Sequence, residues 1–549
     1  MHDHRQIQVR APLLYLLVGI LAGLLLSQQF QPQVVLLLST SLLLGLIGII
    51  KHRITWQWAI YYLTAATLLF WAYGLLRLPH APNNTTLTLP EREAELVLDV
   101  KRIFGSESPY GSTSGIAAIR DAPELSRIQK GASIYFRLKP GVSSKLTIQR
   151  GQWLQTTGVL TPMPTEDEPE ERNFQTYLKD IGVHYRFDRN SDILELRPPS
   201  PFDTFCREMN TAFQNYLLLG APADSELPNV YQAMLLGRKA ALNKDQNERF
   251  RMTGTMHFFA ISGLHIGVIA TVIAQGLALL RVPRRISPFI GLPLLYLYVE
   301  ITGAPPSAVR AFLMALFFWL SFAFQRQRSP FAALVASAVF VLIIQPAQLW
   351  SVGFQLSYSV VLSILLFGLP LYQILRTRLH FFRWLPQSDW RPWQRSIHWS
   401  LDKLALLFAI SFSAWLASTP LSAGLFEFIA PGAIVLNMLL VNLAALVISG
   451  GVIALTASLL YAPSLCGFIN HSAWLLISGM DFLVTLWTKL PGAILSCKGF
   501  PIWISYCALG LFFGLLFAHH FRAKRTHGWF LLAAPVALLA TIIIGYIQT

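Results

Sequence analysis

Charged side chains are scarce in this sequence. Only 13% of its 549 residues are Asp, Glu, Lys or Arg, while 54% are hydrophobic. A soluble globular domain carries roughly 25% charged residues. At about 150 residues per domain the length would suggest three or four soluble domains, but the composition excludes them. The sequence predicts a membrane protein.

Cysteine is also scarce, with four scattered residues and neither a CxxC pair nor a Cys/His spacing. This excludes a readable disulfide framework and a structural zinc motif. No Walker motif and no HxHxDH-type cluster occur, and the groups His2-Asp3-His4 and His519-His520 lie beside apolar runs without further ligands. We therefore expect no metal, no cofactor and no enzyme activity, including nuclease activity, in this chain.

Long apolar runs, by contrast, are abundant. Residues 11–30, 32–50 and 56–78 are each close to the ~20 residues that cross a bilayer, and they define a first membrane block, residues 1–78. A second block, residues 256–549, holds ten more runs: 256–280, 286–302, 306–324, 330–345, 352–375, 403–425, 431–461, 464–488, 500–520 and 528–546. We expect about thirteen membrane-spanning helices.

The run 431–461 makes that count provisional. It is long for a single crossing, and Asn437, Asn442 and the pair Gly450-Gly451 interrupt its apolar character. A re-entrant piece there would change the number of crossings by one.

The polar block between the membrane blocks divides in two. In residues 79–198, apolar and polar residues alternate in segments such as 95–102, 133–138 and 153–160, with Gly and Pro between them, which predicts a small β-domain. Residues 199–255 form a linker in which apolar side chains recur at helical spacing, and this favours an amphipathic, interfacial helix. Its apolar face comprises Phe202, Phe205, Met209, Phe213, Tyr216 and Leu217.

The distribution of Lys and Arg predicts the orientation. Short cytoplasmic loops are enriched in both residues. Placing the N-terminus in the cytoplasm puts the basic loops there as well: Lys51/Arg53, Arg281/Arg284/Arg285, Arg326/Arg328, Arg376–Arg395 and Arg522/Lys524/Arg525. The β-domain and the C-terminus then lie outside. The net charge of +15 is mostly a consequence of this topology, because residues 90–200 hold 15 basic and 16 acidic residues.

Within the β-domain, residues 101–150 carry nine basic and three acidic residues. Basic strand faces with interleaved aromatic rings suit a nucleic-acid backbone, although ordinary solvated strand faces explain the pattern equally well. The candidates for nucleic-acid binding are Lys130, Tyr135, Arg137, Lys139 and Lys145.

Polar residues inside apolar runs are the second group of candidates, because burial in a membrane is costly for them. Ser262 and His265 are three apart and would share one helix face. They fit an interhelical hydrogen bond or the lining of a polar passage, and no nearby carboxylate supports a hydrolytic dyad. Arg310 either snorkels to the membrane surface or lies at the mouth of an anion pathway. Gln355, Asn437 and Asn442 suit either helix-helix contacts or a pathway.

The loop from Arg376 to Trp399 combines arginines with four tryptophans. This combination favours an interfacial anchor on anionic lipid. Stacking on an emerging nucleic-acid strand is the alternative.

Several strings together resemble the ComEC family of competence proteins. HFFAISGLHIG (257–267) is similar to a family motif, and TGAPPSAVRAFLMA (302–315), RQRSPFAALVASA (326–338) and GFQLSYSVV (353–361) are similar to the motifs that follow it. The β-domain resembles the OB-like domain of that family, with RNFQTYLKDIGVHYRF (172–187) as its most similar element.

The resemblance implies a channel in the bacterial inner membrane that imports single-stranded DNA during natural transformation. The expected partners are single-stranded DNA, membrane lipids, a DNA receptor on the outer face, a separate nuclease and a cytoplasmic motor or strand-binding protein. A second copy of this chain, in a homo-oligomer, is a further candidate. The chain departs from many family members in lacking a C-terminal metallo-β-lactamase-like domain. A transporter or flippase for another polyanionic or lipid-linked solute is the alternative.

Overall fold

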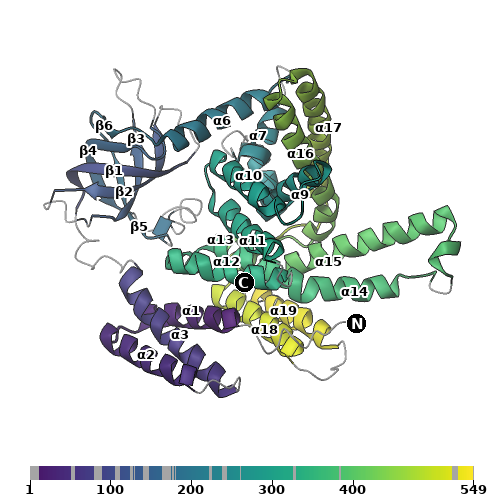
Figure 1. Ribbon diagram of the computed structural model, residues 1–549, viewed down its shortest axis with the longest axis horizontal. Helices are drawn as coiled ribbons and strands as arrows, with labels where there is room; N and C mark the ends of the chain where they lie inside the picture. Colours follow the sequence, from purple (N-terminus) through teal and green to yellow (C-terminus); the bar gives the residue numbers. More distant parts are fainter. Residues whose placement is uncertain are drawn as a thin grey trace.

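A computed structural model describes most of the chain: residues 12–50, 56–78, 90–104, 112–123, 128, 130–139, 148–163, 175, 178–179, 181–221, 226–237, 244–259, 261–324, 329–382, 385–521 and 529–547. A small β-barrel lies beside a large helical block, and the helix α6 (Pro201–Leu217) runs from the barrel into that block (Figure 1).

The barrel consists of β1 (Arg92–Phe104), β2 (Thr113–Asp121), β3 (Ser133–Leu138), β4 (Trp153–Pro162), β5 (Val183–Asp188) and β6 (Leu194–Arg197). The strand order is β1-β2-β3-β5-β4, and β4 pairs back onto β1, so five strands close while β6 extends the edge of β4. Only β3 and β5 are parallel among these pairs. This is an OB-like barrel, and its core includes Leu96, Phe136 and Phe187, which are fully buried.

The first three apolar runs are helices, as predicted: α1 (Pro12–Gln29), α2 (Val34–Ile50) and α3 (Trp56–Arg77). Glycine permits the close approach of α1 to α3, since a Cβ atom at Gly23 would lie too near the backbone of Thr67 and Trp71. The side chains of Ile20 and Leu24 share a hydrophobic cluster with Leu342 of α12 (Pro330–Ile344). The N-terminal helices are therefore packed onto the second membrane block.

Each of the ten later apolar runs also contains helix. After α7 (Leu227–Leu236) and α8 (Lys244–Met252), the remaining helical segments are η4 (Met256–Phe258), α9 (Gly263–Leu279), α10 (Ser287–Ile301), α11 (Pro306–Ala323), α12, η5 (Pro346–Trp350), α13 (Val352–Ser363), η6 (Ile364–Gly368), α14 (Leu369–Arg378), η7 (Gln387–Asp389), α15 (Pro392–Phe426), α16 (Ala433–Leu459), α17 (Pro463–Thr488), α18 (Ile502–Phe521) and α19 (Trp529–Ile547). The short strands β7 (Phe428–Ile429) and β8 (Leu495–Ser496) pair with each other.

Six helices within the described ranges are long and apolar enough to cross a membrane: Trp58–Arg77, Met256–Leu279, Val352–Arg378, Pro392–Phe426, Ala433–Leu459 and Ile502–His520. Six further apolar helices are shorter, with 10–17 residues. The expected thirteen crossings are not confirmed by these lengths.

Two details bear on the sequence-based expectations. The run 431–461 holds one uninterrupted helix of 27 residues, α16, with no re-entrant break. Gly451 fits this helix because its missing side chain makes room for Leu235, whose Cδ1 would clash with a Cβ atom there. In the predicted face of α6, Phe213 and Leu217 are buried, whereas Phe202 and Phe205 are exposed.

Candidate functional site

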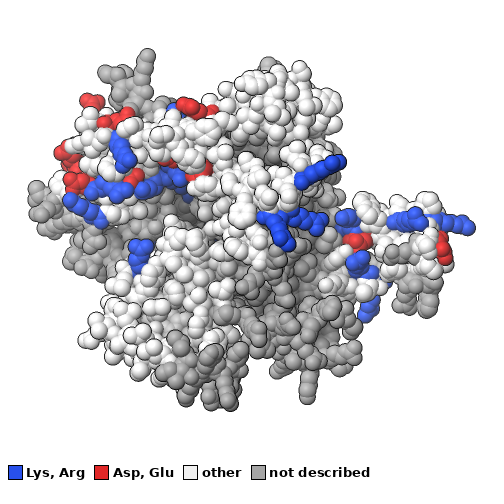
Figure 2. Space-filling model, viewed as in Figure 1, with Lys and Arg blue, Asp and Glu red and all other residues white. Residues whose placement is uncertain are grey.

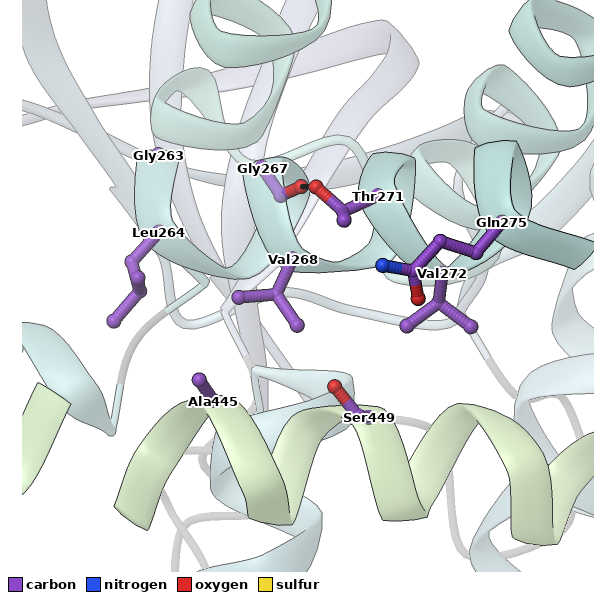
Figure 3. A pocket seen from close by; sticks show the side chains of 9 residues that line it. All are labelled: Gly263, Leu264, Gly267, Val268, Thr271, Val272, Gln275, Ala445 and Ser449. Carbon is purple, nitrogen blue, oxygen red and sulfur yellow. Dashed lines mark hydrogen bonds between the residues drawn. The ribbon is translucent and has the colours of Figure 1, made fainter. Parts of the chain in front are cut away.

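A groove of about 460 Å³ lies between α9 and α16. Its lining comprises Gly263, Leu264, Gly267, Val268, Thr271, Val272, Gln275, Ala445 and Ser449. Figure 3 shows Leu264, Val268 and Val272 of α9 pointing toward Ala445 and Ser449 of α16, with Thr271 turned back toward Gly267. Gly263, Gly267, Thr271 and Gln275 follow each other at intervals of four residues, so they share one side of α9.

Missing side chains keep this groove open. A Cβ atom at Gly263 or Gly267 would meet no atom within 4 Å. The Thr271 hydroxyl donates to the carbonyl oxygen of Gly267 at 2.8 Å, which satisfies that hydroxyl within the helix. All nine lining residues are uncharged. The groove therefore offers an electrically neutral, mostly apolar surface in which Gln275, Ser449 and the glycine backbone supply the polar groups.

The two asparagines of α16 precede its groove-lining residue Ala445 in the helix. Asn442 is exposed and lies three residues before Ala445, hence about one helical turn along the same side. Its side-chain nitrogen lies 3.5 Å from the Met438 carbonyl oxygen. Asn437 is half-buried, and its Oδ1 atom is buried without a hydrogen-bond partner among the described residues.

Ser262 and His265 form a helix cap rather than a link between helices. Ser262 precedes the first residue of α9 and has an extended backbone. Its amide donates to His265 Nδ1 at 3.4 Å, and its hydroxyl lies 3.0 Å from the same atom. The two residues thus do not lie on one face of a continuous helix, because α9 starts only at Gly263. His265 is fully buried and does not line the groove.

The segments that resemble family motifs are joined by hydrogen bonds. The Ser307 hydroxyl donates to the Ile261 carbonyl oxygen, and Arg310 Nη2 donates to the carbonyl oxygen of Gly353 at 2.9 Å. Tyr358 donates to Ser337 at 3.3 Å. Residues separated by nearly one hundred positions thereby form one structural unit around α9, α11, α12 and α13.

Arg310 is only 5% exposed and belongs to the interior of that unit. A Cβ atom at Gly353 would lie 3.2 Å from its Nη2 atom, so glycine lets the guanidinium approach the backbone. Gln355 lies two residues after Gly353 in α13. Its Nε2 donates to the Leu349 carbonyl oxygen at 3.1 Å, and its Oε1 accepts from the Tyr506 hydroxyl at 3.1 Å.

The nucleic-acid-binding candidates lie on or near β3. Arg137 and Lys139 are exposed. Lys130 forms an ion pair with Asp121 at 2.7 Å, and this contact lowers the pKa of the Asp121 carboxyl. Tyr135 is 8% exposed, so its ring is not available for stacking. Lys145 lies outside the described residues.

One ionic contact could not be predicted from the sequence, because its partners are 150 positions apart. Arg150, in the turn before β4, donates to Glu300 at the end of α10 at 2.9 Å. Asp203 of α6 lies 3.9 Å from the same guanidinium. The Asn210 side chain of α6 also donates to the Ile301 carbonyl oxygen at 2.8 Å. These contacts attach the barrel to the helical block.

No cluster of three or more His, Cys, Asp or Glu residues suited to a metal ion occurs within the described ranges. The fold and the groove together define a class of protein: a largely helical membrane protein with an OB-like barrel and an uncharged groove between two helices.

Similarity to known proteins makes the assignment more specific. The family model described as "Competence protein" matches residues 234–522, which is just over half of the chain. The protein belongs to this family, that of the ComEC competence proteins. The match includes both helices of the groove, whereas the barrel lies before it.

Two curated proteins illustrate the similarity. "ComE operon protein 3" of Bacillus subtilis (strain 168) is 29% identical over 256 residues, which cover 46% of this chain and 32% of that protein. "Recombination protein 2" of Haemophilus influenzae (strain ATCC 51907 / DSM 11121 / KW20 / Rd) is 29% identical over 209 residues, covering 36% of this chain and 24% of that protein. The matched segments thus span a third or less of each relative. No solved structure matches.

Proposed function

We propose that this protein passes a single DNA strand across the cytoplasmic membrane during competence, and that the strand runs along the groove between α9 and α16. Membership of the competence family supports a role in DNA uptake. The observation that carries the route is the row of glycine, threonine and glutamine on α9 that lines the groove beside α16.

The chemistry of the groove suits such a route. A phosphodiester strand carries one charge per nucleotide and cannot enter hydrocarbon, so it needs hydrogen-bonding groups at membrane depth. Fixed basic residues would hold the strand tightly, whereas neutral polar groups and exposed glycine backbone permit movement. In this proposal Ser262, Asn437 and Asn442 lie along the path. His265, Arg310 and Gln355 hold the segments that shape it.

Filling the groove should test the route. Leu at Gly267 projects into open space, and because Leu is a better helix former than Gly, α9 should fold normally. We expect Gly267→Leu to reduce transformation at least tenfold with unchanged protein level. Gly276→Leu is the matched control, since Gly276 lies on the same helix, has equally open surroundings and does not line the groove. Equal transformation in the two variants would refute the route.

The orientation is part of the proposal. With thirteen crossings and a cytoplasmic N-terminus, the barrel and the turn at Gly492 lie outside and the loop at Gln387 lies inside. A periplasmic-type reporter should be active when inserted at Gly492 and inactive at Gln387, while a cytoplasmic reporter should show the reverse. The opposite result at either position would overturn this orientation.

The proposed function also requires other proteins. We expect an outer receptor, a separate nuclease and a cytoplasmic motor or strand-binding protein, because we assign neither catalysis nor energy conversion to this chain. The test against a transporter or flippase is a deletion strain. Labelled DNA should fail to reach its cytoplasm while envelope growth stays normal, and impaired growth with normal DNA entry would favour the transporter.

A further inference from the structure

Helices α14 and α15 form an arm that projects away from the rest of the helical block (Figure 1). We call its outer end, residues 376–382 and 385–399, the arm tip. In the proposed orientation the arm tip lies on the cytoplasmic side, where an imported strand would emerge.

The length of α15 places the tip beyond the membrane. α15 has 35 residues, about 52 Å at 1.5 Å per residue, against a hydrocarbon core of about 30 Å. From Leu404 to its end at Phe426, α15 holds no charged residue, so Asp402 and Lys403 mark the edge of its apolar part. Toward the tip, Arg395 and Trp393 lie eight and ten residues further, roughly 12–15 Å along the helix. The headgroup layer on each side of a bilayer is only about 5–8 Å thick.

The arm tip is a packed structure with its own small core. Trp390 is 6% exposed, and its indole nitrogen donates to the Leu385 carbonyl oxygen at 3.1 Å. The rings of His380, Phe382 and His398 surround it with centroids 4.9–5.8 Å away. The first residue of the turn into α15, Arg391, donates its amide to Gln394 at 2.8 Å. Such packing fixes the direction of the side chains on the outside.

Those outer side chains are basic and aromatic. Phe381 is 62% exposed and Trp393 52% exposed, and the tip also carries the exposed arginines Arg378, Arg391 and Arg395. Asp389 is the acidic residue of the described part of the tip, and it accepts from the Ser388 hydroxyl. Among the charged side chains that Figure 2 shows on the arm, basic ones predominate over acidic ones.

Membrane lipid does not account for this surface. The positive-inside rule explains arginines in a cytoplasmic loop, but it does not explain exposed aromatic rings beyond the headgroups. The attraction of an anionic leaflet reaches about 8 Å at physiological salt, so it can act on Arg395, but it gives no reason for an exposed aromatic ring at Trp393. Trp399, four residues from Lys403, remains close enough to lie among headgroups.

We propose that the arm tip binds single-stranded DNA as it emerges on the cytoplasmic side. Guanidinium groups neutralise phosphates, and exposed aromatic rings stack on bases without regard to sequence. The inference rests on the proposed function, since it requires a strand on that side of the membrane.

Crosslinking in living cells tests the contact directly. A photo-crosslinking amino acid replaces Trp393 in the full-length protein, and cells take up fluorescent DNA during illumination. We expect labelled DNA to be attached at position 393 and little at position 399. Crosslinks at 393 to lipid or to another protein, without DNA, would overturn the inference and identify the real occupant of the tip.

DNA binding by the purified full-length protein in nanodiscs allows a comparison of two matched double variants. For a fluorescent oligothymidylate, Trp393→Ala/Arg395→Ala should raise Kd about tenfold, because stacking of one base and one phosphate contact are lost. The control, Trp399→Ala/Arg284→Ala, removes one exposed ring and one cytoplasmic charge elsewhere and should leave Kd within twofold. Equal Kd values for the two variants would overturn the inference.

The result also separates the two proposals. If cells carrying Trp393→Ala/Arg395→Ala import DNA normally and no crosslink forms, while the deletion strain imports none, the arm inference fails and the proposed function stands. If the deletion strain imports DNA normally, the proposed function itself fails.

Discussion

Individual polar residues inside the helical block serve mainly to connect its segments. Arg310 donates to the Gly353 backbone and Ser307 to the Ile261 backbone. A buried polar group without a partner costs free energy in an apolar environment, so such contacts specify which helices lie together. Residues that look like a pathway in the sequence can therefore be structural.

The consequences of replacing Arg310 follow from this position. Arg310→Gln shortens the side chain and leaves the Gly353 carbonyl oxygen with a weaker partner. One interhelical hydrogen bond contributes about 0.6 kcal/mol on average and about 1.7 at most, and destabilised membrane proteins are cleared by proteases. We expect transformation and immunoblotted protein to fall in proportion. Normal protein with lost transformation would instead place Arg310 in the strand path.

At the scale of elements, the alternation of apolar residues predicted the strand β3, whereas burial changed the expected role of one of its side chains. β3 covers the predicted residues 133–138, and Tyr135 shares a strand face with Arg137 because they are two apart. Yet Tyr135 is buried in a cluster with Leu178 and Val183, which come from a later part of the chain. That covering segment leaves Arg137, and Lys139 just after the strand, as exposed candidates for DNA binding.

The salt dependence of DNA binding should report these two residues. Each phosphate contact with a single strand contributes about 0.7 to the slope of log K against log salt. Arg137→Ala/Lys139→Ala in the full-length protein should weaken oligothymidylate binding and lower the slope by roughly 1.4. As a control, Lys101→Ala/Arg120→Ala should change the slope less, because both side chains bind Asp99 at 2.8 and 2.6 Å and neither lies on β3. An unchanged slope in the double variant would exclude β3 from binding.

At the scale of the whole molecule, the barrel has a fixed place on the helical block. Glu300 is only 10% exposed and neutralises Arg150, while α6 contributes Asp203 and Asn210 to the same junction. A carboxylate at the end of an apolar helix is costly unless it is paired. The ion pair therefore favours the docked barrel over a detached one.

A double-mutant cycle measures this docking. Arg150→Ala, Glu300→Gln and the double variant should show a coupling of about 1 kcal/mol in stability, since the pair is partly exposed. The single variants should also be cut faster by protease in the segment that joins the barrel to α6. Additive effects with unchanged cleavage would show that the ion pair does not hold the barrel.

The amino-acid sequence by itself determined the class of this protein, because the cost of burying charge forces long apolar runs and alternating strands into patterns that are visible locally. It also determined the family resemblance, through short motifs in a fixed order. Only the tertiary structure decided which polar residues line a groove and which are packed away. Gly267 and Gln275 become a lining only when α16 lies opposite, and Arg150 finds Glu300 only after the barrel docks. Contacts between residues far apart in the chain depend on packing, which no local pattern encodes.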